Sequence, residues 1–125
     1  MHYLKLEVWQ RGYQVSLGAC KLLQSCRDFA LKDQISRSAI SIPSNIAEGS
    51  ERRTAKDNVK FLYIAKGSCG ELVTQLMFAR DLGYISEATA NEMIDELIEV
   101  SRMIGGLIRY RSSQIQEKRG EYRGE

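Results

Sequence analysis

The chain has few of the residues that interrupt helices or that commonly do chemistry. Its 125 residues include one proline, Pro43, and one histidine, His2. So little proline favours a mostly helical chain, because proline lacks the backbone N–H that an interior helical position donates. A histidine at the extreme N-terminus is not held rigidly, so Ser-His-Asp and Cys-His nucleophile systems are excluded.

Cysteine and long hydrophobic runs are also scarce. The three cysteines are Cys20, Cys26 and Cys69, an odd number without a C-x-x-C pair, which predicts neither a disulfide framework nor a zinc ribbon. No apolar run approaches the roughly 20 residues that cross a membrane. The N-terminus also lacks the apolar core of a signal peptide. We therefore expect a cytoplasmic protein with no membrane partner.

The excess of positive charge is small. There are 18 lysines and arginines against 16 acidic residues, a net charge of +2, which does not by itself require a nucleic-acid partner. Hydrophobic residues make up 43% of the chain and charged residues 27%. These values are typical of a soluble globular protein, and the length is that of one domain with a single core.

Hydrophobic periodicity predicts four helices. Their approximate ranges are 3–27, 31–49, 54–83 and 86–111. Thr54 and Ser86 are candidate N-caps, and Gly49 and Gly83 are candidate C-terminal caps. The fold prediction is all-α, an up-down-up-down antiparallel four-helix bundle over residues 1–111. Residues 112–125 are polar and aperiodic, which predicts a mobile charged tail.

The stretch SAISIPSNIAEGSERR, which begins at Ser38, holds the only proline. Apolar residues at helical spacing run straight through it: Leu31, Ile35, Ala39, Ile42 and Ile46. Pro43 leaves the carbonyl of Ala39 without its helical donor, which predicts a kinked helix that ends at Gly49. Asn45 and Glu48 follow on one face. Two interpretations remain open for them, a satisfied structural pair or a ligand contact at the bend.

Two glycines, Gly67 and Gly70, lie inside the third predicted helix. Each costs about 1 kcal/mol relative to alanine. A helix that keeps such residues usually approaches another helix closely, so we expect a close contact at both positions.

The first predicted helix is apolar over about twice the width that a surface helix needs. One interpretation is a helix at the centre of its own bundle. The other is a helix that also buries a face against a second subunit, with Trp9 and Tyr13 as the candidate oligomer interface.

Four basic residues cluster after the second helix: Arg52, Arg53, Lys56 and Lys60. Lysine in the first turn of a helix opposes the helix dipole, so helix stability does not explain the cluster. We consider it a candidate nucleic-acid-binding surface, and a merely solvated surface is the alternative.

The fourth helix carries a row of acids: Glu92, Asp95, Glu96 and Glu99. A magnesium-dependent, all-α nucleotide hydrolase would use such a row, and this is the alternative function. The row lies opposite the apolar face, however, and there is no histidine to complete a di-iron site. We therefore expect a non-enzymatic protein with no catalytic residue, no metal and no cofactor.

Four blocks of the sequence resemble a known family. They are LEVWQ near the start, QISRSAISIPSNIAEGSERRT across Pro43, FLYIAKGSCGELVTQL in the third helix and ARDLGYIS before the fourth. The family comprises small four-helix-bundle proteins encoded by intervening sequences in bacterial 23S rRNA genes. The resemblance covers most of residues 4–110, and SIPSNIAEG, with Pro43, Asn45, Glu48 and Gly49, is its most specific part.

The family is similar in fold to the accessory variability protein of diversity-generating retroelements, a barrel-shaped pentamer that acts with RNA and a reverse transcriptase. The resemblance therefore implies a homo-oligomer, in particular a pentamer. It also implies an association with RNA or a nucleic-acid-processing protein, or a scaffold role. It carries over no catalytic residue.

Overall fold

The computed structural model describes residues 1–122, and its helices follow one another with short connections. A short 3-10 helix, η1, spans His2–Lys5. Four α-helices follow: α1 (Glu7–Leu22), α2 (Phe29–Ser50), α3 (Ala55–Asp81) and α4 (Glu87–Tyr122). The predicted all-α class is confirmed, since the described residues contain no strand.

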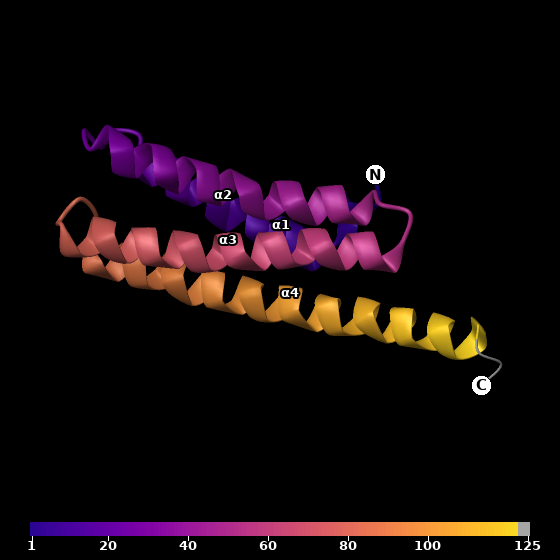
Figure 1. The fold of residues 1–125 in the computed structure, drawn as a ribbon. Coiled ribbons are helices and arrows are strands. Elements are labelled where there is room, and N and C mark those ends of the chain that lie inside the picture. The colour runs from indigo at the N-terminus through magenta and orange to yellow at the C-terminus, as the bar shows by residue number, and fades with distance from the viewer. Residues whose placement is uncertain (123–125) are drawn as a thin grey trace.

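The four helices form an antiparallel bundle (Figure 1). Each helix packs against two neighbours, α1 against α2 and α4, and α3 against α2 and α4, while the diagonal pairs within residues 1–122 make no close backbone approach. The side chains that the four helices bury together are mainly Leu, Ile, Val and Ala. Within the described chain, no helix combines the length and the apolar character needed to cross a membrane.

The first α-helix is shorter at both ends than the predicted single helix over residues 3–27, since α1 begins at Glu7 and ends at Leu22. Leu6 has an extended backbone, with φ −74° and ψ 125°, and separates η1 from α1. The side chain of Leu6 is half-buried against the core. The backbone turn at Leu6 also lets Tyr3 pack against Trp9, with ring centroids 5.3 Å apart. Tertiary packing of apolar side chains thus overrides helical periodicity here.

Helix α2 runs without interruption through Pro43, as the periodicity predicts. A bend of its axis at Pro43 stays a prediction. The predicted cap at Gly49 is wrong, because the helix continues to Ser50 and Gly49 does not have a positive φ. Gly49 instead lies where α2 meets α3. A Cβ atom added there would come within 3.1 Å of the backbone oxygen of Asn58 and of the Cβ of Phe61.

The ends of α3 are as the sequence predicts. The Thr54 hydroxyl accepts a hydrogen bond from the backbone N–H of Asp57 at 3.2 Å. At the other end Gly83 has φ +81°. The N–H of Gly83 donates to the carbonyl of Arg80, and the N–H of Tyr84 donates to the carbonyl of Ala79. This is the pattern of a Schellman cap.

The predicted close contact at the glycines inside α3 is wrong. Gly67 and Gly70 are exposed, and an added Cβ would meet nothing within 4 Å at either position. The close approaches occur at Gly12, Gly18 and Gly49 instead, because those glycines face neighbouring helices.

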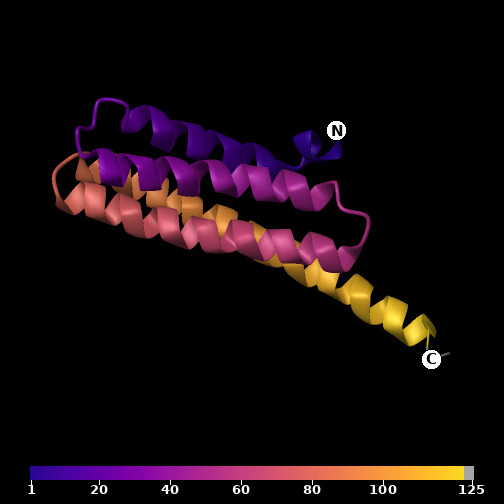
Figure 2. The same cartoon turned by 45° about the horizontal axis from the view of Figure 1, so that its top comes forward.

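Helix α4 begins as predicted, since the hydroxyl of Ser86 accepts from the N–H of Thr89 at 3.2 Å. Its predicted end at Arg111 is wrong, because the helix continues to Tyr122 and its last turns project beyond the bundle (Figure 2). Extending a formed helix carries no nucleation cost, and residues 112–122 contain no proline to stop it. The mobility of the predicted tail stays a prediction, and residues 123–125 lie outside the described residues.

Candidate functional site

The predicted basic cluster lies at one end of the bundle, around the turn between α2 and α3. Arg52 and Arg53 lie in the turn, and Lys56 and Lys60 lie one turn apart on α3. All four are exposed. The up-down-up-down topology brings the start of α1 and the C-terminal half of α4 to the same end (Figures 1 and 2).

The four cations are not equivalent. Arg52 forms an ion pair with Glu48 on the preceding helical turn, with 2.6 Å between Nη2 and Oε1, and its guanidinium lies 4.7 Å from the ring centre of Phe61. The ammonium of Lys60 lies 5.9 Å from the same ring. Arg53 and Lys56 have no carboxylate within 4 Å among the residues that the structure describes. These two are therefore the cations most open to a partner.

Acidic side chains limit the local excess of charge. One hollow at the turn is lined by Glu51, Arg52, Arg53, Thr54 and Asp57. Asp57 lies in the first turn of α3, where a carboxylate complements the helix dipole. The positive potential that one subunit offers here is therefore modest.

A separate polar cavity, which we call the turn pocket, has a volume of about 250 Å³. Its lining residues are Ser50, Arg52, Arg53, Thr54, Ala55, Asn58, Arg111 and Gln114. Asn58 is 7% exposed, and its Oδ1 atom has no hydrogen-bond partner; the Nε atom of Arg111 is buried and also lacks one.

Sequence reasoning missed Asn58 and Arg111 as site residues. From the sequence, Arg111 is a cation near the predicted end of the fourth helix, where a positive charge complements the helix dipole. The available signal was topological, because an antiparallel fourth helix must bring its C-terminal end back to the α2–α3 turn. Asn58 gave no local signal, since a polar residue one turn into a helix is ordinary.

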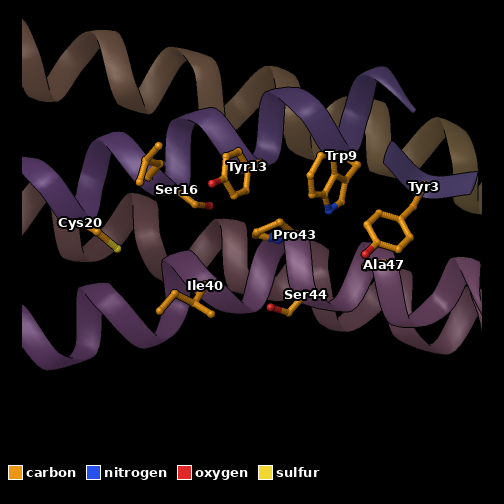
Figure 3. A pocket seen from close by; sticks show the side chains of 10 residues that line it. Tyr3, Trp9, Tyr13, Ser16, Cys20, Ile40, Pro43, Ser44 and Ala47 are labelled. Carbon is orange, nitrogen blue, oxygen red and sulfur yellow. The ribbon is translucent and has the colours of Figure 1, made fainter. Parts of the chain in front are cut away.

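The candidate interface residues Trp9 and Tyr13 border an apolar groove of about 470 Å³ between α1 and α2 (Figure 3). Three aromatic rings follow one another along it. Trp9 packs against Tyr3 on one side and stacks on Tyr13 on the other, with centroid distances of 5.3 Å in both cases. Pro43 and Ile40 of α2 line the groove as well. Tyr13 is 42% exposed and Ile40 58%, so the groove presents apolar surface to the outside.

Asn45 and Glu48, considered above as a pair, make separate contacts. The side-chain amide of Asn45 donates to the carbonyl and to the hydroxyl of Ser41, both at 2.8 Å. The Ser41 hydroxyl lies 2.8 Å from that of Ser68 on α3. Asn45 therefore belongs to a small polar network that connects α2 with α3 beside Pro43. Glu48 faces Arg52 instead.

The acidic row on α4 is partly engaged by arginines. Glu96 accepts hydrogen bonds from both Nε and Nη2 of Arg11, and the bond from Nε is 3.3 Å long. Glu96 therefore faces α1, whereas the sequence predicted that it would face open solvent. Glu99 accepts from Arg102, which lowers the pKa of that carboxyl below its usual value. Among the described residues, no group of three or more His, Cys, Asp or Glu side chains is arranged to hold a metal ion. This arrangement gives no observation in favour of the hydrolase alternative.

Comparisons with known proteins agree with this fold. One solved structure is a protein of unknown function from the S23 ribosomal protein family of Bacteroides thetaiotaomicron. It superimposes with a TM-score of 0.76 at 22% identity, over 81% of this chain and 97% of that chain. At that identity the likeness shows the fold alone. No curated protein matches the sequence. Residues 4–106 match the family described as 23S rRNA-intervening sequence protein. The chain therefore belongs to the 23S rRNA-intervening sequence protein family.

Proposed function

We propose that this protein is a non-enzymatic homo-oligomer that associates with RNA through electrostatic contacts at the α2–α3 turn. The observation that carries the proposal is the pair of exposed cations, Arg53 and Lys56, at the end of the bundle where Arg52, Lys60 and Arg111 also lie. Within the described part of the chain, neither member of the pair has a carboxylate partner.

One subunit offers too few charges for tight binding, because Glu48, Glu51 and Asp57 offset part of them. Several subunits would repeat the cluster on a continuous surface, and linked sites raise the overall affinity without any new contact. Oligomerisation is therefore part of the proposal. We propose a pentamer as its form, with the groove around Trp9 and Tyr13 covered by a second copy.

The mode of binding follows from the chemistry of the cluster. Two aromatic rings lie near these cations: Phe61 lies against Arg52 and Lys60, and Tyr110 lies 5.6 Å from the guanidinium of Arg111. They do not form a row of stacking platforms for successive bases. Binding is therefore expected to be largely independent of sequence and to weaken steeply with salt, because each neutralised phosphate releases counterions.

The test is fluorescence anisotropy with a labelled, structured RNA at 50 and 200 mM salt. Arg53→Glu with Lys56→Glu is the informative double variant. Arg52 is left unchanged because its contacts with Glu48 and Phe61 are structural. The control is Lys21→Glu with Arg37→Glu, which makes the same change of charge in the half of the bundle away from this turn.

We expect the first double variant to lose binding at 50 mM salt and the control to keep it, with the molar mass of both unchanged. Equal binding by the two variants would refute the turn as the RNA surface. Absence of binding by the wild-type protein at 50 mM salt would refute the RNA association itself.

A further inference from the structure

The turn pocket has a strongly cationic lining. Three guanidinium groups contribute to it, those of Arg52, Arg53 and Arg111. Only Arg52 has a carboxylate partner, Glu48, within the part of the chain that the structure describes. Arg111 donates to the neutral side chain of Gln114 at 3.2 Å. Two guanidinium groups of the lining, those of Arg53 and Arg111, therefore have no carboxylate partner in the described part of the chain, although Glu51 and Asp57 line the neighbouring hollow; a bound anion would balance the remaining positive charge.

Two buried polar atoms at this pocket have no partner. One is an acceptor, Oδ1 of Asn58, and the other is a donor, Nε of Arg111. Buried polar groups in folded proteins are nearly always hydrogen-bonded. Because both of these unpartnered atoms belong to residues that line one small cavity, a single bound molecule there could be the partner of both. That partner must accept one hydrogen bond and donate another.

The start of α3 adds donors to the same cavity. Thr54 and Ala55 both line it, and the first N–H groups of a 27-residue helix have no partner within the helix. The positive end of the helix dipole also lies there. Backbone N–H groups and guanidinium groups around one cavity favour a tetrahedral oxyanion.

We propose that the turn pocket binds a phosphate monoester. Its oxygens accept hydrogen bonds from Arg53 and Arg111, and its remaining P–OH group donates to Oδ1 of Asn58. Sulfate has the same shape but no hydroxyl, so it leaves Asn58 unpartnered. A volume of about 250 Å³ holds a phosphate group together with part of the group to which it is attached.

One source of the ligand is the terminal phosphate of an RNA chain, and for this source the inference rests on the proposed function. A small phosphate compound is the other source. The chemistry at the pocket is the same for both, so the site can be tested with inorganic phosphate, independently of any RNA.

The first experiment titrates the protein with inorganic phosphate at pH 6.5 by calorimetry, and repeats the titration with sulfate. We expect saturable binding of phosphate and binding of sulfate weaker by about tenfold or more, as for the loss of one buried hydrogen bond. Arg111→Gln and Arg111→Lys should both abolish phosphate binding. Glutamine removes the positive charge, and lysine keeps the charge but has a methylene group in place of the Nε donor. Arg109→Gln is the matched control on the same helix and should bind as the wild type.

Asn58→Leu separates the acceptor from the cations and should make phosphate and sulfate bind alike. Circular dichroism verifies that each variant is folded, and the Arg111 variants suffice if Asn58→Leu does not fold. The proposal is overturned if phosphate does not bind saturably, as when a water molecule bridges Asn58 and Arg111. It is also overturned if Arg111→Gln binds phosphate as well as Arg109→Gln does.

The second experiment identifies the source by comparing RNA oligonucleotides with a 5′-phosphate and a 5′-hydroxyl. A preference of about tenfold for the phosphorylated end, lost in Arg111→Gln, assigns the pocket to an RNA terminus. Phosphate binding without that preference assigns it to a small phosphate compound. If RNA binding fails altogether while inorganic phosphate binds, the proposed function falls and the pocket stands.

Discussion

At the scale of single residues, glycines inside helices differ in their surroundings. Gly49 is buried where α2 meets α3, and Gly67 is exposed on α3. Gly49→Ala should lower the free energy of unfolding by about 1–2 kcal/mol, because the strain of a clash with the backbone of Asn58 exceeds the gain in helix propensity. Gly67→Ala should raise it by about 0.5–1 kcal/mol. Urea denaturation at one protein concentration measures both, and a destabilising Gly67→Ala would contradict the open surroundings of that position.

The cysteines should also differ in reactivity. Burial raises the pKa of the Cys69 thiol to about 11, whereas Cys20 and Cys26 are only half-buried. A thiol reagent at pH 8 should therefore label Cys20 and Cys26 and leave Cys69 unmodified until the protein unfolds. Mass spectrometry of the labelled peptides tests this, and rapid native labelling of Cys69 would contradict it.

The raised pKa of Cys69 also predicts a pH dependence of stability. Because the folded pKa of about 11 exceeds the ordinary 9.0, keeping the thiol neutral stabilises the fold below pH 9, and this contribution is lost as the pH rises through 11. Cys69→Ala lacks the thiol. The difference in unfolding free energy between the wild type and this variant should therefore shrink between pH 9 and 11, as measured by urea denaturation.

At the scale of elements, the start of α3 depends on its cap. Thr54→Ala removes the hydroxyl that accepts from the N–H of Asp57 and should cost about 1 kcal/mol in the free energy of unfolding. Thr74→Ala is the matched control in the same helix, because its hydroxyl bonds only to the carbonyl of Gly70 within that helix. Thermal denaturation followed by circular dichroism compares the two. Equal losses would show that the cap contributes nothing specific.

At the scale of the whole molecule, the exposed apolar groove predicts an assembly. The wild-type protein should elute with a molar mass that is a multiple of 14.2 kDa, and five subunits are the proposed number. Tyr13→Glu with Ile40→Glu should yield the 14.2-kDa monomer, because a charge on each side of the groove opposes its burial. Light scattering after size-exclusion chromatography measures both.

Tyr63→Glu is the control for this assembly, since Tyr63 is 60% exposed but lies on α3, away from the groove. It should leave the oligomer intact. If Tyr63→Glu dissociates the protein and the groove variant does not, the interface lies on α3. A wild-type protein that is monomeric at micromolar concentration would refute the assembly.

The sequence by itself determined the helical class, the number of α-helices, both ends of α3 and the start of α4. Those features depend on interactions within a few residues along the chain. The 3.6-residue period places apolar side chains on one face, Thr54 and Ser86 cap their own helices, and Gly83 adopts its positive φ next to the helix that it ends. The basic cluster was found for the same reason, because Arg52, Arg53, Lys56 and Lys60 are close in sequence.

Only the tertiary structure decided which residues meet across helices. The break at Leu6, the close approach at Gly49 and the facing of Glu96 toward Arg11 each depend on a neighbour far away in sequence. The turn pocket depends on such contacts as well, since Asn58 and Arg111 come together through the antiparallel return of α4. The spacing of these two residues along the chain does not predict that their side chains meet, because the packing angle and rotation of each helix are set by the whole core.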